Sequence, residues 1–203
     1  MSFRHYPLTM KRIIFYVLPI ISGIILFACG QNYVPKPTGY FRIDLPEHTY
    51  RTFDTTFPYT FEIGRITTIE HDKFSPEEPY WINIVYPKFK GRIHLSYKKV
   101  DNNLNQYLDD AFKMANKHIP KANSIKQRVI NTPEHHVYGL IYDITGSETA
   151  SAYQFFLTDS LHHFVRGALY FSVTPNNDSL QPVIEFIKKD VEHMIETFKW
   201  TNK

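Results

Sequence analysis

The chain has 203 residues, of which 23 are Lys or Arg and 20 are Asp or Glu, and it contains one cysteine. A single cysteine excludes an intrachain disulfide, so the folded part must be stabilised by its hydrophobic core. Arg4, Lys11 and Arg12 near the N-terminus account for the excess of positive charge, and removing them leaves 20 basic against 20 acidic residues. A chain that is otherwise formally neutral gives no support for nucleic-acid binding.

The N-terminus has the layout of a lipoprotein signal peptide. Basic residues precede an apolar run at 13–27, which ends at Ala28 and Cys29. The run of 15 residues is shorter than the roughly 20 that span a bilayer, and Leu26-Phe27-Ala28-Cys29 resembles the bacterial lipobox. We expect a signal peptide at 1–28, cleavage between Ala28 and Cys29, and a lipid on Cys29. An ordinary secretion signal with a cysteine nearby is the alternative.

The segment at 29–39 is predicted to be a tether. Its two prolines, Pro35 and Pro37, favour extended polyproline II geometry and prevent a helix from continuing. At about 3.1 Å per residue, ten such residues reach roughly 30 Å. We expect this tether to connect the lipid to a single globular domain at 40–203. The candidate partner-contact residues are Tyr33, Pro35, Pro37 and Tyr40.

Alternation of apolar and polar residues predicts strands in the first part of the domain. The pattern is found at Phe41–Leu45 and again at Tyr59–Ile63. Two further segments, Trp81–Tyr86 and Arg92–Tyr97, are separated by a short stretch that begins with Pro87. We expect these two segments to form a hairpin.

Helical spacing replaces alternation in two places. Apolar residues between Leu104 and Ala115 recur at intervals of three and four, which predicts a helix. The last helix is expected to begin at a cap on Asp178 or Ser179 and to carry a continuous apolar face up to Phe198. That face predicts packing on a sheet. The remaining positions are mixed in charge and are expected to face solvent: Glu185, Lys188, Lys189, Asp190, Glu192 and Glu196.

Three more strands are expected between these helices, at 137–144, 152–158 and 163–173. Because the strands are linked mainly by short turns, the sequence predicts an α+β fold in which an antiparallel β-sheet is covered by helices. The closing hairpin and long helix, which ends in Phe198-Lys199-Trp200, resemble the PsbP-type α/β/α sandwich.

Candidate catalytic and metal-binding residues are few. The ten histidines include the pairs His135-His136 and His162-His163, but neighbours on a strand point to opposite faces and do not chelate one ion. The sequence contains no nucleophile elbow and no phosphate-binding loop. Glu77-Glu78 adjoin a proline in a loop and are expected to be solvated. We therefore expect no metal, no cofactor and no enzymatic activity.

Several strings of residues resemble the gliding-motility lipoprotein family GldD. The first is Tyr33-Val34-Pro35-Lys36-Pro37-x-Gly39-Tyr40-Phe41-Arg42-Ile43-Asp44-Leu45-Pro46, and the others are Trp81-Ile82-Asn83-Ile84, Ile93-His94-Leu95-Ser96-Tyr97, Tyr138-Gly139-Leu140-Ile141-Tyr142-Asp143, Arg166-Gly167-Ala168-Leu169-Tyr170-Phe171 and Glu196-Thr197-Phe198-Lys199-Trp200. The resemblance implies a non-enzymatic envelope lipoprotein required for gliding, whose partners are the membrane and other proteins of the gliding and type IX secretion apparatus. Some members of that family have cysteines at the positions of Phe57 and Tyr80.

Gly30 follows the cysteine, and no acidic cluster comes directly after it. By analogy with lipoprotein sorting rules, this favours the outer membrane, with the domain facing the periplasm. The alternative function is an envelope lipoprotein that binds a small molecule or a polymer, which a deep aromatic pocket would favour.

Overall fold

The computed structural model describes residues 43–53 and 56–201, which belong to the compact unit Tyr40–Lys203. The expectations for the signal peptide, Ala28, Cys29 and the tether residues Tyr33, Pro35, Pro37 and Tyr40 lie outside the described residues. Within the described ranges, no helix is both long and apolar enough to cross a membrane.

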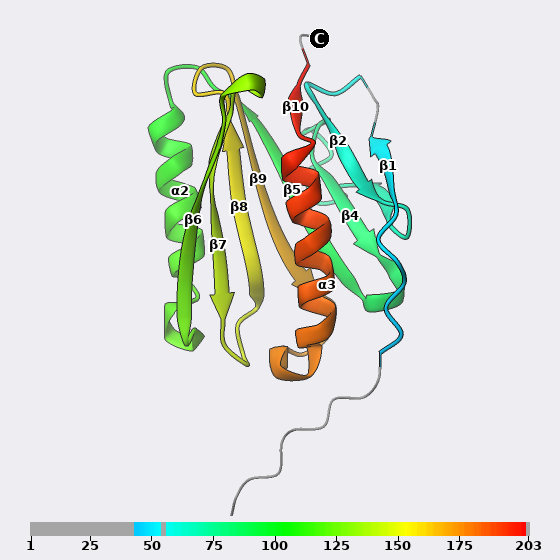
Figure 1. Cartoon of the computed structure of the whole chain (residues 1–203). Helices are drawn as coiled ribbons and strands as arrows, with labels where there is room; N and C mark the ends of the chain where they lie inside the picture. Colours follow the sequence, from blue (N-terminus) through cyan, green and yellow to red (C-terminus); the bar gives the residue numbers. More distant parts are fainter. Residues whose placement is uncertain (1–42, 54–55, 202–203) are drawn as a thin grey trace, which may run out of the picture. The chain divides into compact units, whose positions relative to one another are not determined.

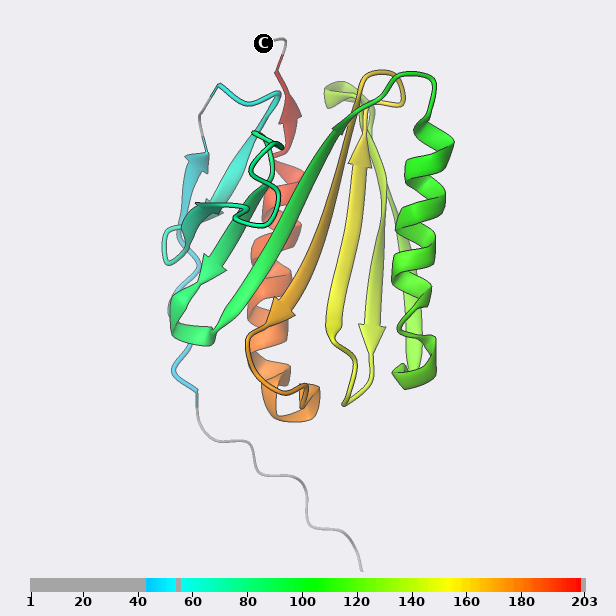
Figure 2. The same ribbon diagram turned by 180° about the vertical axis from the view of Figure 1, so that it is seen from behind.

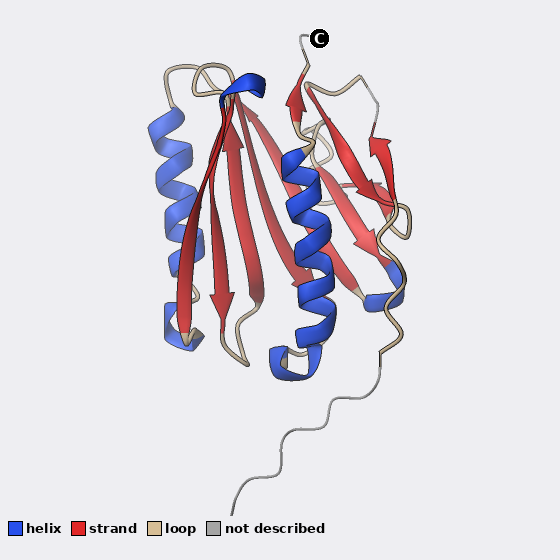
Figure 3. Ribbon diagram, viewed as in Figure 1, coloured by secondary structure: helices blue, strands red, loops and turns tan. Residues whose placement is uncertain are grey.

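Ten antiparallel strands form two sheets in the described part of the chain (Figures 1 and 3). The large sheet has the order β3-β4-β5-β9-β8-β7-β6. Its strands are β3 (Thr68–His71), β4 (Ile82–Tyr86), β5 (Gly91–Lys99), β9 (His163–Phe171), β8 (Ser151–Thr158), β7 (Val137–Thr145) and β6 (Ser124–Thr132). The small sheet contains β1 (Tyr50–Phe53), β2 (Tyr59–Gly64) and β10 (Lys199–Trp200). Short 3₁₀ helices are η1 (Pro87–Phe89), η2 (Ile119–Lys121) and η3 (Pro133–His135).

Two α-helices lie on opposite faces of the large sheet. Helix α2 (Leu104–Asn116) packs on the back of the sheet, whereas α3 (Asn177–Glu196) covers the front and also packs against β2 of the small sheet (Figures 1 and 2). This arrangement confirms the predicted α+β class with an antiparallel sheet covered by helices.

The apolar face of α3 is buried as its spacing predicts. Ile187 and Val191 are almost completely buried in a core cluster that also contains residues of both sheets. The predicted cap is wrong: Asn176, not Asp178 or Ser179, caps the helix, since its side chain accepts a hydrogen bond from the amide of Ser179.

The predicted hairpin is confirmed, with β4 and β5 paired antiparallel and joined through η1. The strand expected at Phe41–Leu45 is wrong for its described part, because Ile43–Leu45 has no ladder partner and Leu45 is exposed. In the predicted α2 face, Phe112 is exposed rather than packed. Strand β6 is not predicted by the sequence pattern, and it extends the expected sheet by one edge strand beside β7.

Two glycines allow neighbouring strands to approach closely. A Cβ atom at Gly139 of β7 would lie 2.0 Å from the carbonyl oxygen of Phe156. A Cβ atom at Gly167 of β9 would lie 2.1 Å from the ring of Phe155 on β8, which is its partner in the ladder. The ring of Phe155 can therefore pack over Gly167 only because that position lacks a side chain, and Gly139 lets its strand lie close to the backbone of β8.

Candidate functional site

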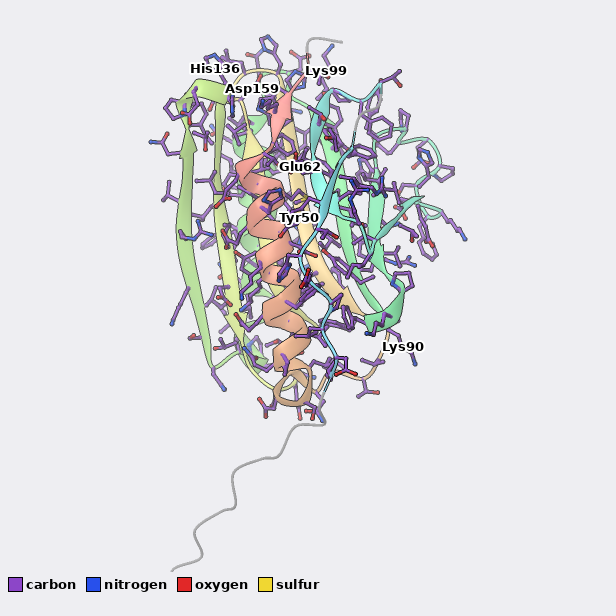
Figure 4. The ribbon with its side chains drawn as sticks, turned by 45° about the vertical axis from the view of Figure 1, so that its right-hand side comes forward. Tyr50, Glu62, Lys90, Lys99, His136 and Asp159 are labelled. Carbon is purple, nitrogen blue, oxygen red and sulfur yellow. The ribbon has the colours of Figure 1, made fainter. Side chains whose placement is uncertain are left out.

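The two histidine pairs meet at one end of the domain. His135 is the last residue of η3. His136 follows it and has a left-handed backbone with φ of 52°. His162 and His163 come from the turn between β8 and β9. All four line one open depression of about 460 Å³, which we call the histidine end; Figure 4 shows His136 and Asp159 at this end, away from Lys90.

Aromatic stacking and hydrogen bonds hold this end together. The ring of His163 stacks on that of Trp200 with 5.1 Å between centroids, and its Nδ1 lies 2.8 Å from the hydroxyl of Tyr97. The indole of Trp200 donates a hydrogen bond to the carbonyl of His136. Burial lowers the pKa of His163 below its ordinary value. The imidazole is therefore a neutral packing group rather than a cation at neutral pH.

Asp159 fixes the turn that carries the second pair. Its Oδ1 accepts hydrogen bonds from the backbone amides of Leu161, His162 and His163. Burial alone would raise the pKa of Asp159, but these amides outweigh it and hold the pKa below its ordinary value. The turn is thus ordered, and it leaves the side chain of Leu161 69% exposed at the rim.

The structure corrects the sequence interpretation of these histidines. Strand geometry does not apply to them, because His135 ends a 3₁₀ helix, His136 and His162 lie in turns, and only His163 belongs to a strand, of which it is the first residue. The spacing within each pair carries no information about the other pair, so their approach is not predictable from it. Among the described residues, no group of three or more His, Cys, Asp or Glu side chains is placed to hold a metal ion.

The loop acids expected to be solvated differ from each other. Glu77 is exposed, whereas Glu78 accepts a hydrogen bond from the ammonium of Lys98. The ammonium of Lys98 also lies 4.9 Å from the centre of the Trp81 ring. Glu78 therefore helps to fix its loop on the sheet.

A second polar cluster lies under α3 and was not expected. Asp190, predicted to face solvent, is only 3% exposed. Its carboxylate lies 2.6 Å from Nδ1 of His48 and accepts a hydrogen bond of 3.1 Å from the hydroxyl of Tyr86. The ring of His48 stacks on Phe186. With its carboxylate enclosed, Asp190 links the first described segment of the chain to the core.

Other polar positions of α3 are also used for packing, which corrects the prediction of a solvated face. Glu192 accepts hydrogen bonds from Tyr153 and Arg128 on the large sheet. Lys188 donates to Asp143 of β7 over 2.8 Å. Toward the small sheet, Nε2 of His193 lies 2.6 Å from the carboxylate of Glu62 on β2, and Figure 4 shows Glu62 beside α3.

Tyrosines in these clusters hold their protons tightly. Burial, followed by the charge and hydrogen bond of Asp190, raises the pKa of Tyr50 to about 12. Burial and Asp190 also raise the pKa of Tyr86 well above its ordinary value. The phenols are therefore donors to carboxylates at neutral pH.

Alkaline conditions should destabilise the domain through these phenols. The folded pKa of Tyr50, about 12, exceeds its unfolded value of 10.0, so the folded state retains a proton that the unfolded state loses. Stability should fall as pH rises from about 10 to about 12. Urea unfolding across this range should show a smaller loss for Tyr50→Phe than for the unchanged protein. Identical pH dependence in both proteins would contradict the link between Tyr50 and Asp190.

A family profile described as gliding motility lipoprotein GldD matches residues 30–200. The chain belongs to the GldD family. The resemblance expected from the sequence is thereby confirmed, and the protein is a lipoprotein of the cell envelope that is associated with gliding motility. A comparison with curated proteins gave no match.

Among solved structures, the GldD-family chain is similar to cyanobacterial PsbP (CyanoP) from Synechocystis sp. PCC 6803. The identity is 10%, the match covers 82% of this chain and 100% of CyanoP, and the TM-score is 0.47. A similarity of this size supports no conclusion about function.

Phe57 and Tyr80, the two positions singled out by the family resemblance, are in contact. Their ring centroids are 5.3 Å apart, with the rings edge to face. The aromatic pair links the turn before β2 to the loop before β4.

Proposed function

We propose that this protein is a non-enzymatic component of the gliding and type IX secretion apparatus, held by a lipid on Cys29 at the outer membrane and facing the periplasm. The observation that carries this proposal is the GldD-family match, which starts at residue 30, directly after Cys29, and extends to residue 200. The sequence order of signal, cysteine and proline-containing tether supports it.

The use of acidic groups in the domain supports a role without catalysis. Asp190, Glu192 and Glu62 each bind a side chain from another part of the fold. A general acid or base must instead reach the proton that it transfers. The carboxylates of the α3 clusters therefore serve to fix the helix between the two sheets.

The histidine end is our candidate for the contact surface of the domain. It lies at the end of the domain that carries β10, opposite the end where the first described residues begin (Figure 1). Its rim carries the exposed Leu161 on an ordered turn. An apolar side chain on a rigid turn loses little conformational freedom when a partner covers it.

Deleting the gene should abolish spreading on surfaces and impair the delivery of surface adhesins, and the intact gene should restore both.

Complementation with Leu161→Asp should leave spreading impaired at a normal protein level, because a charge is placed in the contact. The matched control is Val129→Asp on β6, since Val129 is 71% exposed and Leu161 is 69% exposed. Spreading of the deletion strain would contradict the motility role, whereas equal behaviour of the two variants would contradict only the contact surface.

A further inference from the structure

The back of the large sheet contains a groove that the motility role does not explain. Helix α2 stands at one side of this face and does not extend over β4 and β5 (Figure 2). The groove has a volume of about 360 Å³, which is within the range of small-molecule sites. Its polar and aromatic lining comprises Asp72, Trp81, Asn83, His94, Ser96, Arg166 and Tyr170.

Strand register places polar side chains side by side across the groove floor. Asn83 of β4 is opposite His94 of β5, and His94 is opposite Ala168 of β9. Ala168 is in turn opposite Gln154 of β8. Because paired residues share a face, these side chains form one row on the back of the sheet.

Two amides in this row are buried with an unsatisfied atom. Asn83 is 2% exposed and Gln154 is 1% exposed. In the described part of the chain, neither Oδ1 of Asn83 nor Nε2 of Gln154 has a hydrogen-bond partner. Buried polar atoms are normally paired, because an unpaired one destabilises the fold. Asn83 is part of the groove lining, so the acceptor without a partner lies at the groove floor.

The other groups of the groove define the chemistry of that ligand. Gln154 accepts a hydrogen bond of 2.5 Å from the guanidinium of Arg166, which fixes this donor at the floor. Burial, with the charge of Arg92, lowers the pKa of His94, so the imidazole is neutral at neutral pH. Asp72 also lines the groove and carries a charge opposite to that of Arg166. The lining therefore offers donors and acceptors together without a net charge.

Aromatic rings complete the site. The ring of Tyr170 lies edge to face against His94, with 5.5 Å between centroids, and the ring of Trp81 forms part of the wall. Aromatic rings provide apolar contact area for the C–H face of a ligand. Asn83 has an acceptor atom without a partner, and Arg166 offers only donors, so the ligand must both donate and accept hydrogen bonds. Hydroxyl groups do both.

We propose that this groove binds a neutral saccharide unit, such as a hexose or an N-acetylhexosamine of a longer polymer. Hydroxyls of the sugar pair with Asn83 and Arg166, and its C–H face packs on Trp81. The sequence left open that this lipoprotein binds a small molecule or a polymer, and the groove would be the site of that binding. The proposal does not depend on the motility role.

The test uses the full mature lipoprotein, purified in a detergent without a sugar headgroup. A Trp200→Phe background leaves Trp81 as the only tryptophan, so its fluorescence reports on the groove. The probes are tetra-N-acetylchitotetraose, maltotetraose, diglycine and inorganic phosphate. We expect saturable binding of at least one tetrasaccharide and none of diglycine or phosphate.

Asn83→Leu should weaken that binding about tenfold, as expected for the loss of a hydrogen bond to a buried amide. The same substitution should raise Tm, because it removes an unpaired buried group. Tyr138→Phe, on the same face but outside the groove lining, is the matched control and should bind as the parent does. If Asn83→Leu does not fold, Arg166→Gln takes its place and should weaken binding, because Arg166 is the other group that pairs with the sugar hydroxyls.

The proposal is overturned if neither saccharide binds, or if diglycine or phosphate binds in their place. Saccharide binding that both groove variants leave unchanged would place the sugar elsewhere and would overturn it equally.

Discussion

Replacing Ile187 by Asp should lower the free energy of unfolding by roughly 3–5 kcal/mol. Ile187 is fully buried in the core cluster beneath α3. Its Cδ1 would lie 2.9 Å from a Cβ atom built at Gly91, so the side chain fits closely against β5. A carboxylate at this position would have no partner and no route to solvent. Chemical denaturation monitored by circular dichroism measures the loss.

The control for this prediction must be chosen from the structure. Glu192, on the face expected to be solvated, is unsuitable because it binds Tyr153 and Arg128. Lys189 is exposed on the same helix, and Lys189→Ala should change stability by less than about 0.5 kcal/mol. Similar losses in the two variants would contradict the packing of α3 described above.

Replacing Cys29 by Ala should leave the chain without a lipid and impair the normal processing of its signal peptide. Each buried CH₂ group of an acyl chain contributes about 0.8 kcal/mol to membrane binding, and two or more chains make the anchoring durable. Without the thiol, no lipid can be attached at the predicted site. Incorporation of labelled fatty acid measures the first effect, and the apparent mass of the chain measures the second.

Ala28→Gly is the matched control for the anchor, since it keeps a small residue before the cysteine. It should be lipidated and processed as the unchanged protein is. Labelled fatty acid in the Cys29→Ala variant would disprove the anchor assignment.

The regular core of the fold was predictable from the sequence, whereas its edges were not. The β4–β5 hairpin and α3 carry strong apolar periodicity, and both formed as expected. Strand β6 was missed because it is an edge strand, and most of its side chains are polar and exposed. Propensity rules describe half-buried strands and give little signal for such a segment.

The polar clusters around α3 were missed for a different physical reason. Helical periodicity identifies the face packed on one sheet, but α3 contacts both the large sheet and β2. The small sheet covers the side that carries Asp190, so the carboxylate is buried by a contact distant in sequence from the helix. The histidine end has the same origin, because its two turns are brought together only by the order of strands in the sheet.

We propose that this GldD-family lipoprotein acts through contact and not through catalysis. Complementation of the deletion strain tests this central claim most directly. Five single variants keep the shape of a side chain but remove its acid–base chemistry: His135→Gln, His136→Gln, His162→Gln, His163→Gln and Glu77→Gln. Spreading is measured for each strain together with the amount of protein in its membranes. We expect normal spreading from every variant present at the normal level. Because the four histidines line the proposed contact surface, the result that would contradict the claim is a Glu77→Gln variant that is present at the normal level and does not spread.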